Sequence, residues 1–539
     1  MADKRSLGWV LLVCVLSIAW LIGTAEVATA ADDFPDAAEN YKLMGEGALD
    51  TPFSKLAPWP DTDGDVFYSG CYAPERCFVT VSIKNPTKPK VLAKVYTFDP
   101  EKSVPPIDAN PVWTNNALYG GLTIKAPCGD WVGVNQETLT SAELEAKATC
   151  WDPGWNTHSH FVAYPDWNTA PDIGPGCGPL LKKKVLVVNM ERWRGGPPGA
   201  SSKRANYHGL KFYDVSDPRN PVFLSYWEAP ADAFQPAGPN ETWGGTHHFF
   251  FDGRYVYTGA YYQGFVNRIF VIVDVKDPYH PVEAGKLWIP GQGTTPAELA
   301  ARDWIPQSVF SPIVYSGGKL KKGVGVHWTQ VVGDTAIVSW HQAGLVLANV
   351  SDKTNPTFIS RLDYLTPEFM ANEPGLGPSP DYQTCQQQNG NPATGAACGN
   401  THSAKLIPGT KFIWVTDEYF ICPYGHGRVV DASDPYNMKL ISHFLLPENT
   451  DCTKTYTRRT PSTHLGNMRD GILHLAWYGA GVRAIDLRDP YHPKFKGFFT
   501  YNDTGGGAET YDVIFGPKDG FMYASDSFEG VRVLKYKGK

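Results

Sequence analysis

A repeated unit restricts the fold of this chain more than any other feature. Residues 463–493 read THLGNMRDGILHLAWYGAGVRAIDLRDPYHP. The unit comprises a Thr-His pair, a short strand, an Asp-Gly turn, an apolar strand, a Gly-rich turn, a second apolar strand and an Asp-Pro corner. Recognisable copies recur along the chain. Because a unit of about four short strands cannot bury its faces alone, the copies must stack. The repeat therefore predicts an all-β fold in which the units form a ring.

We count seven units, which predicts a seven-bladed β-propeller. The seventh unit ends at residues 530–535 without an Asp-Pro corner or an outer strand, whereas residues 41–49 read as a spare strand near the N-terminus. The simplest closure lets this N-terminal strand complete the last blade and cover its bare edge. Long insertions connect the outer strand of one blade to the inner strand of the next, and we expect them on one face. They span about residues 107–155, 291–322, 366–399 and 449–461.

The N-terminus has the features of a secretory signal peptide. Residues 1–30 have a charged start, an apolar run at 7–22 and the small residues Ala-Thr-Ala at 28–30. The apolar run is long enough to cross a membrane as an uncleaved anchor, but the Ala-Thr-Ala sequence favours cleavage. We therefore expect a periplasmic or secreted protein, with residues 31–539 forming a single propeller domain that is not stably inserted in a membrane.

Export places the cysteines of the mature chain in an oxidising compartment, where disulfides persist. The sequence has ten cysteines, of which Cys14 lies in the signal peptide. Sequence alone does not determine the connectivity, and proximity gives the simplest pairing. The proposed pairs are Cys71 with Cys77, Cys128 with Cys150, Cys385 with Cys398 and Cys422 with Cys452, which leaves Cys177 over.

Charge and short motifs exclude several classes of function. The formal net charge is −7, and no long basic run is present, which argues against nucleic acid as a partner. The sequence contains no GxSxG motif, no phosphate-binding P-loop and no CxxC pair. Serine-hydrolase, nucleotide-hydrolase and thioredoxin-like chemistry therefore have no support.

The apolar strand that ends in Asp, followed by an Asp-Pro corner, resembles the LVIVD-repeat proteins. The pattern is clearest at Phe270–Asp274 and at Ile485–Pro490. These proteins are exported prokaryotic β-propellers, often of unknown role, and the resemblance covers most of the mature chain. It implies the propeller fold but says little about activity. The sequence departs from the pattern at Asn349 and Lys535, where Asp is expected, and at Lys353, which replaces the corner proline.

The recurring Thr-His pair is the strongest indication of a functional site. If each pair opens the innermost strand of its blade, the histidines lie together at one mouth of the central channel. Converging imidazoles can hold Fe, Cu or Zn. We predict His247, His327, His402 and His464 as metal ligands, with His158 as a fifth candidate, and we expect Fe or Cu rather than Zn.

The turn after the second strand of each blade returns to the same mouth. We expect His341 and Glu509 as accessory catalytic groups, and Asp417, Glu418 or Glu509 as acceptors that orient the ligands. The other residues predicted near this mouth are Glu191, Tyr261, Tyr478 and Asp526.

Two further histidines need separate assignment. Strand alternation predicts that only one of His247 and His248 faces the channel, and alignment on the turn glycines favours His247. His474 lies within an apolar strand and is expected to be a hydrogen-bonded core residue.

A histidine cage on the axis of a propeller resembles the four-His iron centre of carotenoid-cleaving oxygenases. It also resembles the metal site proposed for the selenium-binding, methanethiol-oxidising propellers. Both are resemblances of architecture, because the chain matches neither family's motifs and fold does not imply function. They favour a metal-dependent oxidoreductase or oxygenase that acts on a small organic substrate.

Two alternatives remain open at the level of sequence. In WD-type propellers a histidine near the start of a blade bonds an aspartate on a later strand, and the equivalent pairs here are His247 with Asp274, His402 with Asp431 and His464 with Asp486. In that case the protein is a non-catalytic module that binds a protein or a glycan. The second alternative is a hydrolase in which Glu191 and either Asp417 or Glu418 act as an acid–base pair.

Overall fold

Strands, nearly all of them paired antiparallel, are the main elements of the structure, a computed structural model. It describes residues 37–47, 54–56, 62–63, 65–71, 77–96, 160–163, 184–192, 209–228, 244–307, 309, 314–316, 319–363, 399–420, 422, 424–451, 454, 456, 460–501, 509–516, 520–526 and 530–538. Two short helices, α5 (Pro296–Ala301) and α8 (Pro447–Thr450), accompany the strands. The predicted all-β, propeller-like fold is confirmed.

The strands follow one another in antiparallel groups that match the sequence units. In the first half of the chain they are β3 (Ser54–Leu56), β4 (Thr62–Asp63), β5 (Val66–Cys71), β6 (Cys77–Ser82) and β7 (Lys90–Tyr96); β8 (His160–Ala163), β9 (Val185–Arg192), β10 (Gly209–Asp214) and β11 (Val222–Glu228); and β12 (Gly244–Phe251), β13 (Tyr255–Tyr261), β14 (Arg268–Asp274) and β15 (Val282–Leu287). The apolar strands predicted in each repeated unit are buried strands in the structure.

The same order continues in the second half. The groups are β19 (Val324–Val332), β20 (Thr335–His341), β21 (Leu345–Asn349) and β22 (Thr357–Leu362); β23 (Thr401–Leu406), β24 (Phe412–Asp417), β25 (Gly427–Asp431) and β26 (Lys439–Phe444); β27 (Gly466–Arg469), β28 (Ile472–Ala476), β29 (Val482–Asp486) and β30 (Lys494–Thr500); and β31 (Thr510–Phe515), β32 (Met522–Asp526) and β33 (Gly530–Tyr536). The insertion predicted at 291–322 carries α5 and a small sheet of β16 (Trp304–Pro306), β17 (Val314–Ser316) and β18 (Lys319–Lys322).

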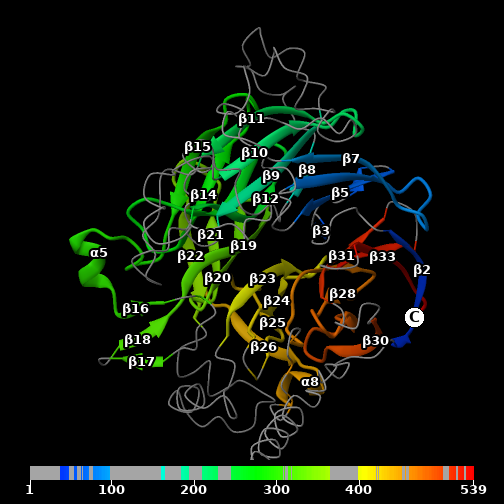
Figure 1. Ribbon diagram of the computed structural model, residues 1–539. Helices are drawn as coiled ribbons and strands as arrows, with labels where there is room; N and C mark the ends of the chain where they lie inside the picture. The colour runs from blue at the N-terminus through cyan, green and yellow to red at the C-terminus, as the bar shows by residue number, and fades with distance from the viewer. Residues whose placement is uncertain are drawn as a thin grey trace, which may run out of the picture.

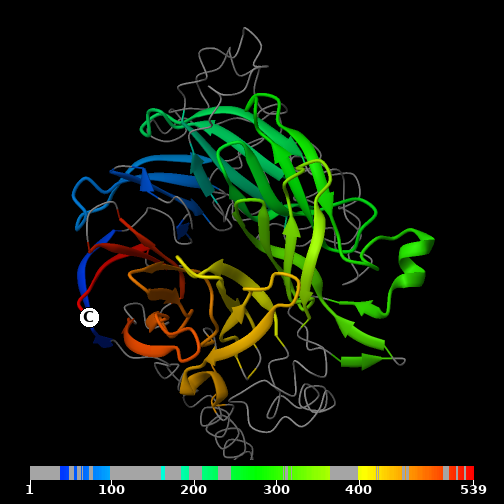
Figure 2. The same ribbon diagram turned by 180° about the vertical axis from the view of Figure 1, so that it is seen from behind.

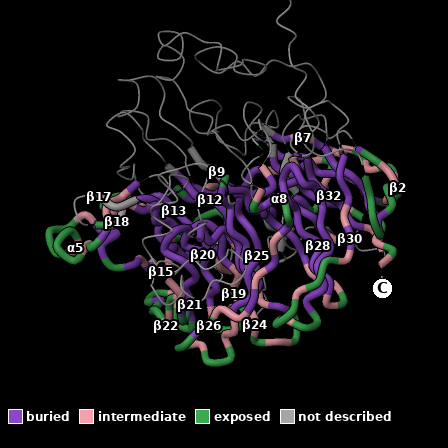
Figure 3. Tube along the Cα trace, turned by 90° about the horizontal axis from the view of Figure 1, so that it is seen from below, coloured by how far each residue is buried: buried purple, intermediate pink, exposed green. Residues whose placement is uncertain are grey.

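The groups are arranged around a centre, and the colours from blue through green to red run once around the molecule (Figures 1 and 2). Apolar side chains between neighbouring groups form the core; for example, Tyr257 and Phe270 pack with Val338 and Trp340 of the next group. Most strands are buried, and the exposed residues gather at turns (Figure 3). Helices long and apolar enough to cross a bilayer are absent from the described part of the chain.

The N-terminal strand closes the arrangement as predicted. β2 (Tyr41–Gly47) pairs with β33 in an antiparallel register that runs from Tyr41 opposite Tyr536 to Gly47 opposite Val531. A side chain at Gly45 would lie 2.0 Å from the backbone oxygen of Thr87, so only glycine fits where this strand passes the first group's corner. The structure adds β1 (Ala37–Glu39), which pairs with β30 and which the sequence did not predict.

Several predictions fall outside the described residues. These are the signal peptide, the insertion at 107–155, nearly all of the insertion at 366–399, and His158. At least one side chain of every proposed cysteine pair also lies outside them, so the pairings stay predictions.

The aspartate that ends the third strand of a unit holds the turn that follows. Its side chain accepts a hydrogen bond from the backbone N–H two residues later, as in Asx turns. Asn349 makes the same contact, with Ser351, which explains why asparagine can replace aspartate here. The other instances are Asp214 with Ser216, Asp274 with Lys276, Asp431 with Ser433 and Asp486 with Arg488.

Hydroxyl groups on outer strands fasten neighbouring groups together. Ser442 Oγ in β26 donates to the backbone oxygen of Pro490, in the corner of the next group, at 2.6 Å. Ser360 Oγ in β22 donates to Pro435 O at the same distance, 2.6 Å. The proline corner is therefore a contact between groups as well as a turn.

Replacing Ser442 with alanine should lower the free energy of unfolding by about 1 kcal/mol, the usual net contribution of one hydrogen bond. Ser351→Ala is the matched control, because Ser351 lies on an exposed turn and its described contact uses the backbone N–H. Denaturant titration measures both variants. Equal stabilities of the two variants would show that the contact between groups contributes nothing.

His474 is a buried core residue, as predicted. It is 3% exposed, and its Nδ1 lies 2.6 Å from the hydroxyl of Tyr41 in β2, which links the closing strand to β28. Burial, with a smaller effect of the Arg469 guanidinium, lowers the pKa of His474 to about 3.

The low pKa of His474 predicts a specific loss of stability in acid. The unfolded chain takes up this proton near pH 6.5 and the folded chain only near pH 3. The stability associated with neutral, buried His474 is therefore fully present above about pH 6.5 and is lost as the pH falls toward 3. In His474→Gln, the fall in unfolding free energy with decreasing pH should be shallower by up to about 1.4 kcal/mol per pH unit. Tyr41→Phe should keep the wild-type slope, because burial is the main cause of the shift; identical slopes in wild type and His474→Gln would contradict the assignment.

Candidate metal centre

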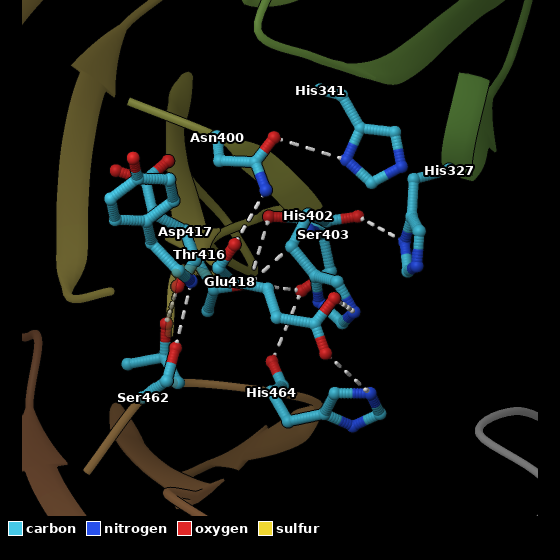
Figure 4. A network of polar contacts seen from close by, with 12 residues as sticks. His327, His341, Asn400, His402, Ser403, Thr416, Asp417, Glu418, Ser462 and His464 are labelled. Carbon is cyan, nitrogen blue, oxygen red and sulfur yellow. Dashed lines mark hydrogen bonds and ion pairs between the residues drawn. The ribbon is translucent and has the colours of Figure 1, made fainter. Parts of the chain in front are cut away.

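Four predicted histidine ligands lie together, buried between the inner strands. His247 in β12 and His327 in β19 bring their Nε2 atoms to 2.7 Å. The ring centroids of His327 and His402 in β23 are 3.8 Å apart, and those of His402 and His464, which precedes β27, are 4.4 Å apart. None of the four is more than 4% exposed. Figure 4 shows His327, His402 and His464 close to one another. The convergence predicted for these four residues is confirmed.

A change of register in the inner strand turns these histidines toward one another. In β23 the register with β24 shifts between Thr401 and Ser403, so His402 is an extra residue with no opposite partner in the ladder. Such β-bulges redirect a side chain and are frequent beside functional sites. In β12 the shift covers Thr246 to Phe249, a stretch that contains both neighbouring histidines.

The prediction that only one of His247 and His248 can face the cluster is wrong. The ring of His248 lies 4.7 Å from that of His247 and 4.8 Å from that of His327, and His248 is 1% exposed. Strand alternation fails here because the bulge in β12 interrupts it. The two adjacent histidines in the sequence were the one feature that could have indicated that His248 also belongs to the cluster.

Hydrogen bonds to backbone oxygens determine the tautomer of two of the histidine rings. His327 Nδ1 lies 2.8 Å from the backbone oxygen of His402, and His464 Nδ1 lies 2.5 Å from that of Tyr511. A carbonyl oxygen only accepts hydrogen bonds, so each Nδ1 carries the proton. When the ring is neutral, each Nε2 then carries a lone pair and not a proton. Metal-bound histidines commonly show this arrangement.

Burial keeps His327 neutral. It lowers the pKa of His327 well below the usual value, and the neighbouring rings of His402 and His247 lower it further. Neutral imidazole is the form that binds metal ions.

Glu418, which the sequence suggested as an orienting group or as one member of a hydrolase acid–base pair, lies among the ligand nitrogens. Its Oε2 is 3.5 Å from His402 Nε2 and its Oε1 is 3.9 Å from His464 Nε2. Tyr478, at the end of the neighbouring unit's second strand, donates its hydroxyl hydrogen to Glu418 Oε1. Burial and the Glu418 carboxylate raise the pKa of Tyr478 well above its usual value, so the phenol stays protonated. The site therefore combines imidazoles with one anionic group.

His341 supports the cluster from one side. Its Nε2 accepts from Arg268 Nη2 at 2.8 Å, and its Nδ1 donates to Asn400 Oδ1 at 3.2 Å. Burial, and then Arg268, lower the pKa of His341 well below the usual value. Asn400 Nδ2 in turn donates to the backbone oxygen of Glu418 at 2.5 Å, and Figure 4 shows this chain. Both ring nitrogens of His341 are therefore engaged in hydrogen bonds, and the catalytic role predicted for it stays a prediction.

The remaining residues that the sequence predicted near the site either lie at the edge of the cluster, bind another side chain or fall outside the described residues. The backbone N–H of Glu509 donates to Asp526 Oδ2 at 2.6 Å, and the Glu509 carboxylate helps to raise the pKa of Tyr478, so Glu509 lies at the edge of the cluster. Asp417 forms a buried ion pair with Arg428. The side chain of Glu191 lies outside the described residues, as does His158.

The described contacts contradict the WD-type alternative. The imidazoles of His247 and His464 contact other imidazoles and Glu418, as given above. The carboxylate of Asp274 instead binds Arg254, and that of Asp486 binds Arg488. The repeated aspartates therefore hold their own turns.

The donors fit a first-row transition metal. Three overlapping groups have ligand atoms that all lie within 4.8 Å of one another: His247, His248 and His327; His248, His402 and His464; and His327, His402 and Glu418. Two donors at about 2.0–2.2 Å from one ion, at 90° to 180°, lie roughly 2.9–4.3 Å apart. The two Glu418 distances fall in this range, and the closest imidazole pair needs only a small outward shift. Imidazole with carboxylate suits Fe, Cu and Zn.

Tyr478→Phe should weaken metal binding about 10- to 100-fold, the usual effect of removing a contact that orients a ligand. Tyr501→Phe is the matched control, because Tyr501 donates its buried hydroxyl to Asp526, away from Glu418. Competition with a chelator of known affinity measures both. Equal metal affinities in the two variants would show that the Tyr478 hydroxyl does not hold Glu418 in its binding position.

Comparisons with known proteins leave the family open. No protein-family model matches the chain, and no curated protein matches it. Among solved structures, Raptor of Chaetomium thermophilum gives a TM-score of 0.45 at 6% identity; the alignment covers 93% of this chain and 30% of Raptor. A hypothetical selenium-binding protein from Sulfolobus tokodaii gives 0.44 at 10% identity, over 87% and 85% of the two chains. A periplasmic gluconolactonase of Pseudomonas aeruginosa gives 0.37 at 9% identity, over 65% and 77%. At such scores these similarities carry no argument about function.

Proposed function

We propose that this protein is a metal-dependent oxidoreductase or oxygenase that acts on a small organic substrate. The supporting observation is the set of buried, converging imidazoles, in which backbone oxygens accept hydrogen bonds from Nδ1 of His327 and of His464, so that the Nε2 atoms of these two rings can serve as ligands. A purely structural histidine does not require this convergence. His247 and His402 complete the proposed ligand set, with Glu418 beside them.

The proposed metal is Fe or Cu. When bound, it supplies one-electron redox chemistry that amino-acid side chains do not offer, whereas Zn has no redox chemistry. The chain's own residues bind and orient the ion. Their burial excludes water, which strengthens electrostatic interactions in the site. Tyr478 holds the Glu418 carboxylate, and the pair His341 and Asn400 holds the Glu418 backbone.

We infer that the architecture around this site is a seven-bladed propeller of an exported protein. The support is that the described strands follow one another in seven groups along the chain and that β2 supplies the fourth strand of the last group. Two neighbouring pairs of groups are joined edge to edge, through β9 with β12 and through β20 with β23. The proposed export rests on the N-terminal signal sequence, and the proposed relation to LVIVD-repeat proteins rests on the repeated aspartate. The seven-bladed count is tested by an experimental structure, in which six or eight blades would contradict it.

Turnover tests the proposed activity. The full mature chain is loaded with Fe or with Cu and assayed for oxygen consumption with small thiols, alcohols, aldehydes and amines. We expect turnover that requires the metal and is lost in His402→Ala. The control is His280→Ala, in which the replaced histidine is on an exposed corner. A metal-loaded chain whose metal cannot be reduced and reoxidised would contradict an oxidoreductase and would favour a binding role.

A further inference from the structure

The cluster contains as many donors as two catalytic metal ions would use. Five imidazoles and one carboxylate are buried together, each no more than 5% exposed. Catalytic metal sites commonly use three protein ligands and keep further positions open. The described residues therefore offer enough donors for two ions.

The donor groups overlap, because His248 and His327 each belong to two of them, but the six donors can be divided into two sets along the cluster. His247 is grouped with His248 and His327, and the Nε2 atoms of His247 and His327 are 2.7 Å apart. At the other end, His464 and His402 have ring centroids 4.4 Å apart. Three imidazoles thus gather on one side, and two imidazoles gather with the carboxylate on the other.

Glu418 completes the second set. Its two oxygens face different rings, Oε2 at 3.5 Å from His402 Nε2 and Oε1 at 3.9 Å from His464 Nε2. Both distances suit donors of one ion at bond lengths of about 2.0–2.2 Å. Glu418 is also grouped with His327 of the first set. The carboxylate therefore lies where it can bind the second ion and reach toward the first.

The two sets are adjacent. The ring centroids of His327 and His402 are 3.8 Å apart, which joins the first set to the second. His248 has ligand atoms within 4.8 Å of those of His402 and His464 as well as those of its own set. Paired metal ions in enzymes lie about 3.5–4 Å apart, a separation that neighbouring sets of this kind can hold.

We propose that the cluster holds two metal ions side by side, one on His247, His248 and His327 and the other on His402, His464 and Glu418. This inference rests on the proposed metal-dependent function. His248, unexpected from the sequence, becomes the residue that completes the first set.

Metal stoichiometry tests the two-ion centre. The full mature chain is titrated with Cu(II), and bound copper per chain is measured by elemental analysis after removal of the excess. We expect two ions in wild type, one in His247→Ala, one in His464→Ala, and none in the double variant. His280→Ala, the exposed control, should keep two. Saturation of wild type at one ion would overturn the proposal, and so would loss of all copper in either single variant.

Electron paramagnetic resonance gives a second reading of the same samples. Two neighbouring Cu(II) ions couple magnetically and lower the signal per copper, whereas an isolated ion gives its full signal. Each single variant should therefore show more signal per copper than wild type. Equal signals per copper would overturn the proposal. His247→Gln and His464→Gln replace the alanine variants if thermal unfolding shows that either alanine chain does not fold.

The outcome separates the two proposals. One copper per chain together with metal-dependent turnover would refute the second ion and support the oxidoreductase. Two coppers per chain without turnover with any substrate would support the two-ion centre and contradict the proposed activity.

Discussion

Replacing His327 with alanine should strongly weaken metal binding at the set formed by His247, His248 and His327. His327 belongs to two of the three donor groups, and its ring lies against those of His247 and His402. Loss of a contact that only orients a ligand already weakens binding about 10- to 100-fold, so loss of a ligand shared by two groups should exceed 100-fold. Equilibrium competition with a chelator measures the affinity.

The control for this experiment is His474→Gln. His474 is also a buried histidine with a hydrogen bond, but it contacts Tyr41 and lies outside the donor groups. It should keep the wild-type metal affinity. Thermal unfolding of the metal-free proteins checks that both variants fold. If His327→Ala bound metal as tightly as His474→Gln, the imidazole cluster would not be the metal site.

A chain that starts at residue 48 should lose its cooperative fold or a large part of its stability. It lacks β2, which pairs with β33 and places the buried Tyr41 ring against Tyr536 and His474. Loss of a buried aromatic side chain alone costs about 3–5 kcal/mol. The free edge of β33 would also be open to pairing with other chains. We therefore expect a melting temperature far below that of the full mature chain, together with aggregation.

A chain that starts at residue 40 is the matched truncation. Of the described residues it loses only β1, whose three residues are exposed. It should keep most of the stability, because Tyr41 and the pairing with β33 remain. Equal melting temperatures of the two truncated chains, measured by circular dichroism, would show that β2 does not close the fold.

The repeat made most of the architecture predictable. Short apolar strands separated by glycine turns and Asp-Pro corners appear as antiparallel groups, and the spare strand at residues 41–49 pairs with the last group as Tyr41–Gly47. This succeeded because each unit carries its own turn signals. β1 was missed, because three exposed residues that pair only through the backbone leave no hydrophobic pattern.

The candidate site was predictable in part. Repetition brings like positions to the same place, so the convergence of His247, His327, His402 and His464 follows from the repeat. His248 was excluded because alternation assumes a regular strand, and a β-bulge leaves little trace in one sequence.

The roles of the carboxylates could not be read from the sequence. Glu418 and Asp417 are neighbours in the chain and both lie near the mouth. Only the fold shows that Asp417 turns to Arg428 while Glu418 turns to the imidazoles. From the sequence, the repeated aspartates were candidate partners for the histidines. Spacing along the chain does not show that their carboxylates already accept hydrogen bonds within an Asx turn.

The most direct test of the central claim is elemental analysis of the full mature chain, purified from cells without added chelator. We expect at least one Fe or Cu per chain, and release of that metal by a strong chelator should lower the melting temperature, because a ligand that binds the folded state stabilises it. A folded chain that contains no metal, binds none when Fe or Cu is supplied, and melts at the same temperature with and without chelator would contradict the account.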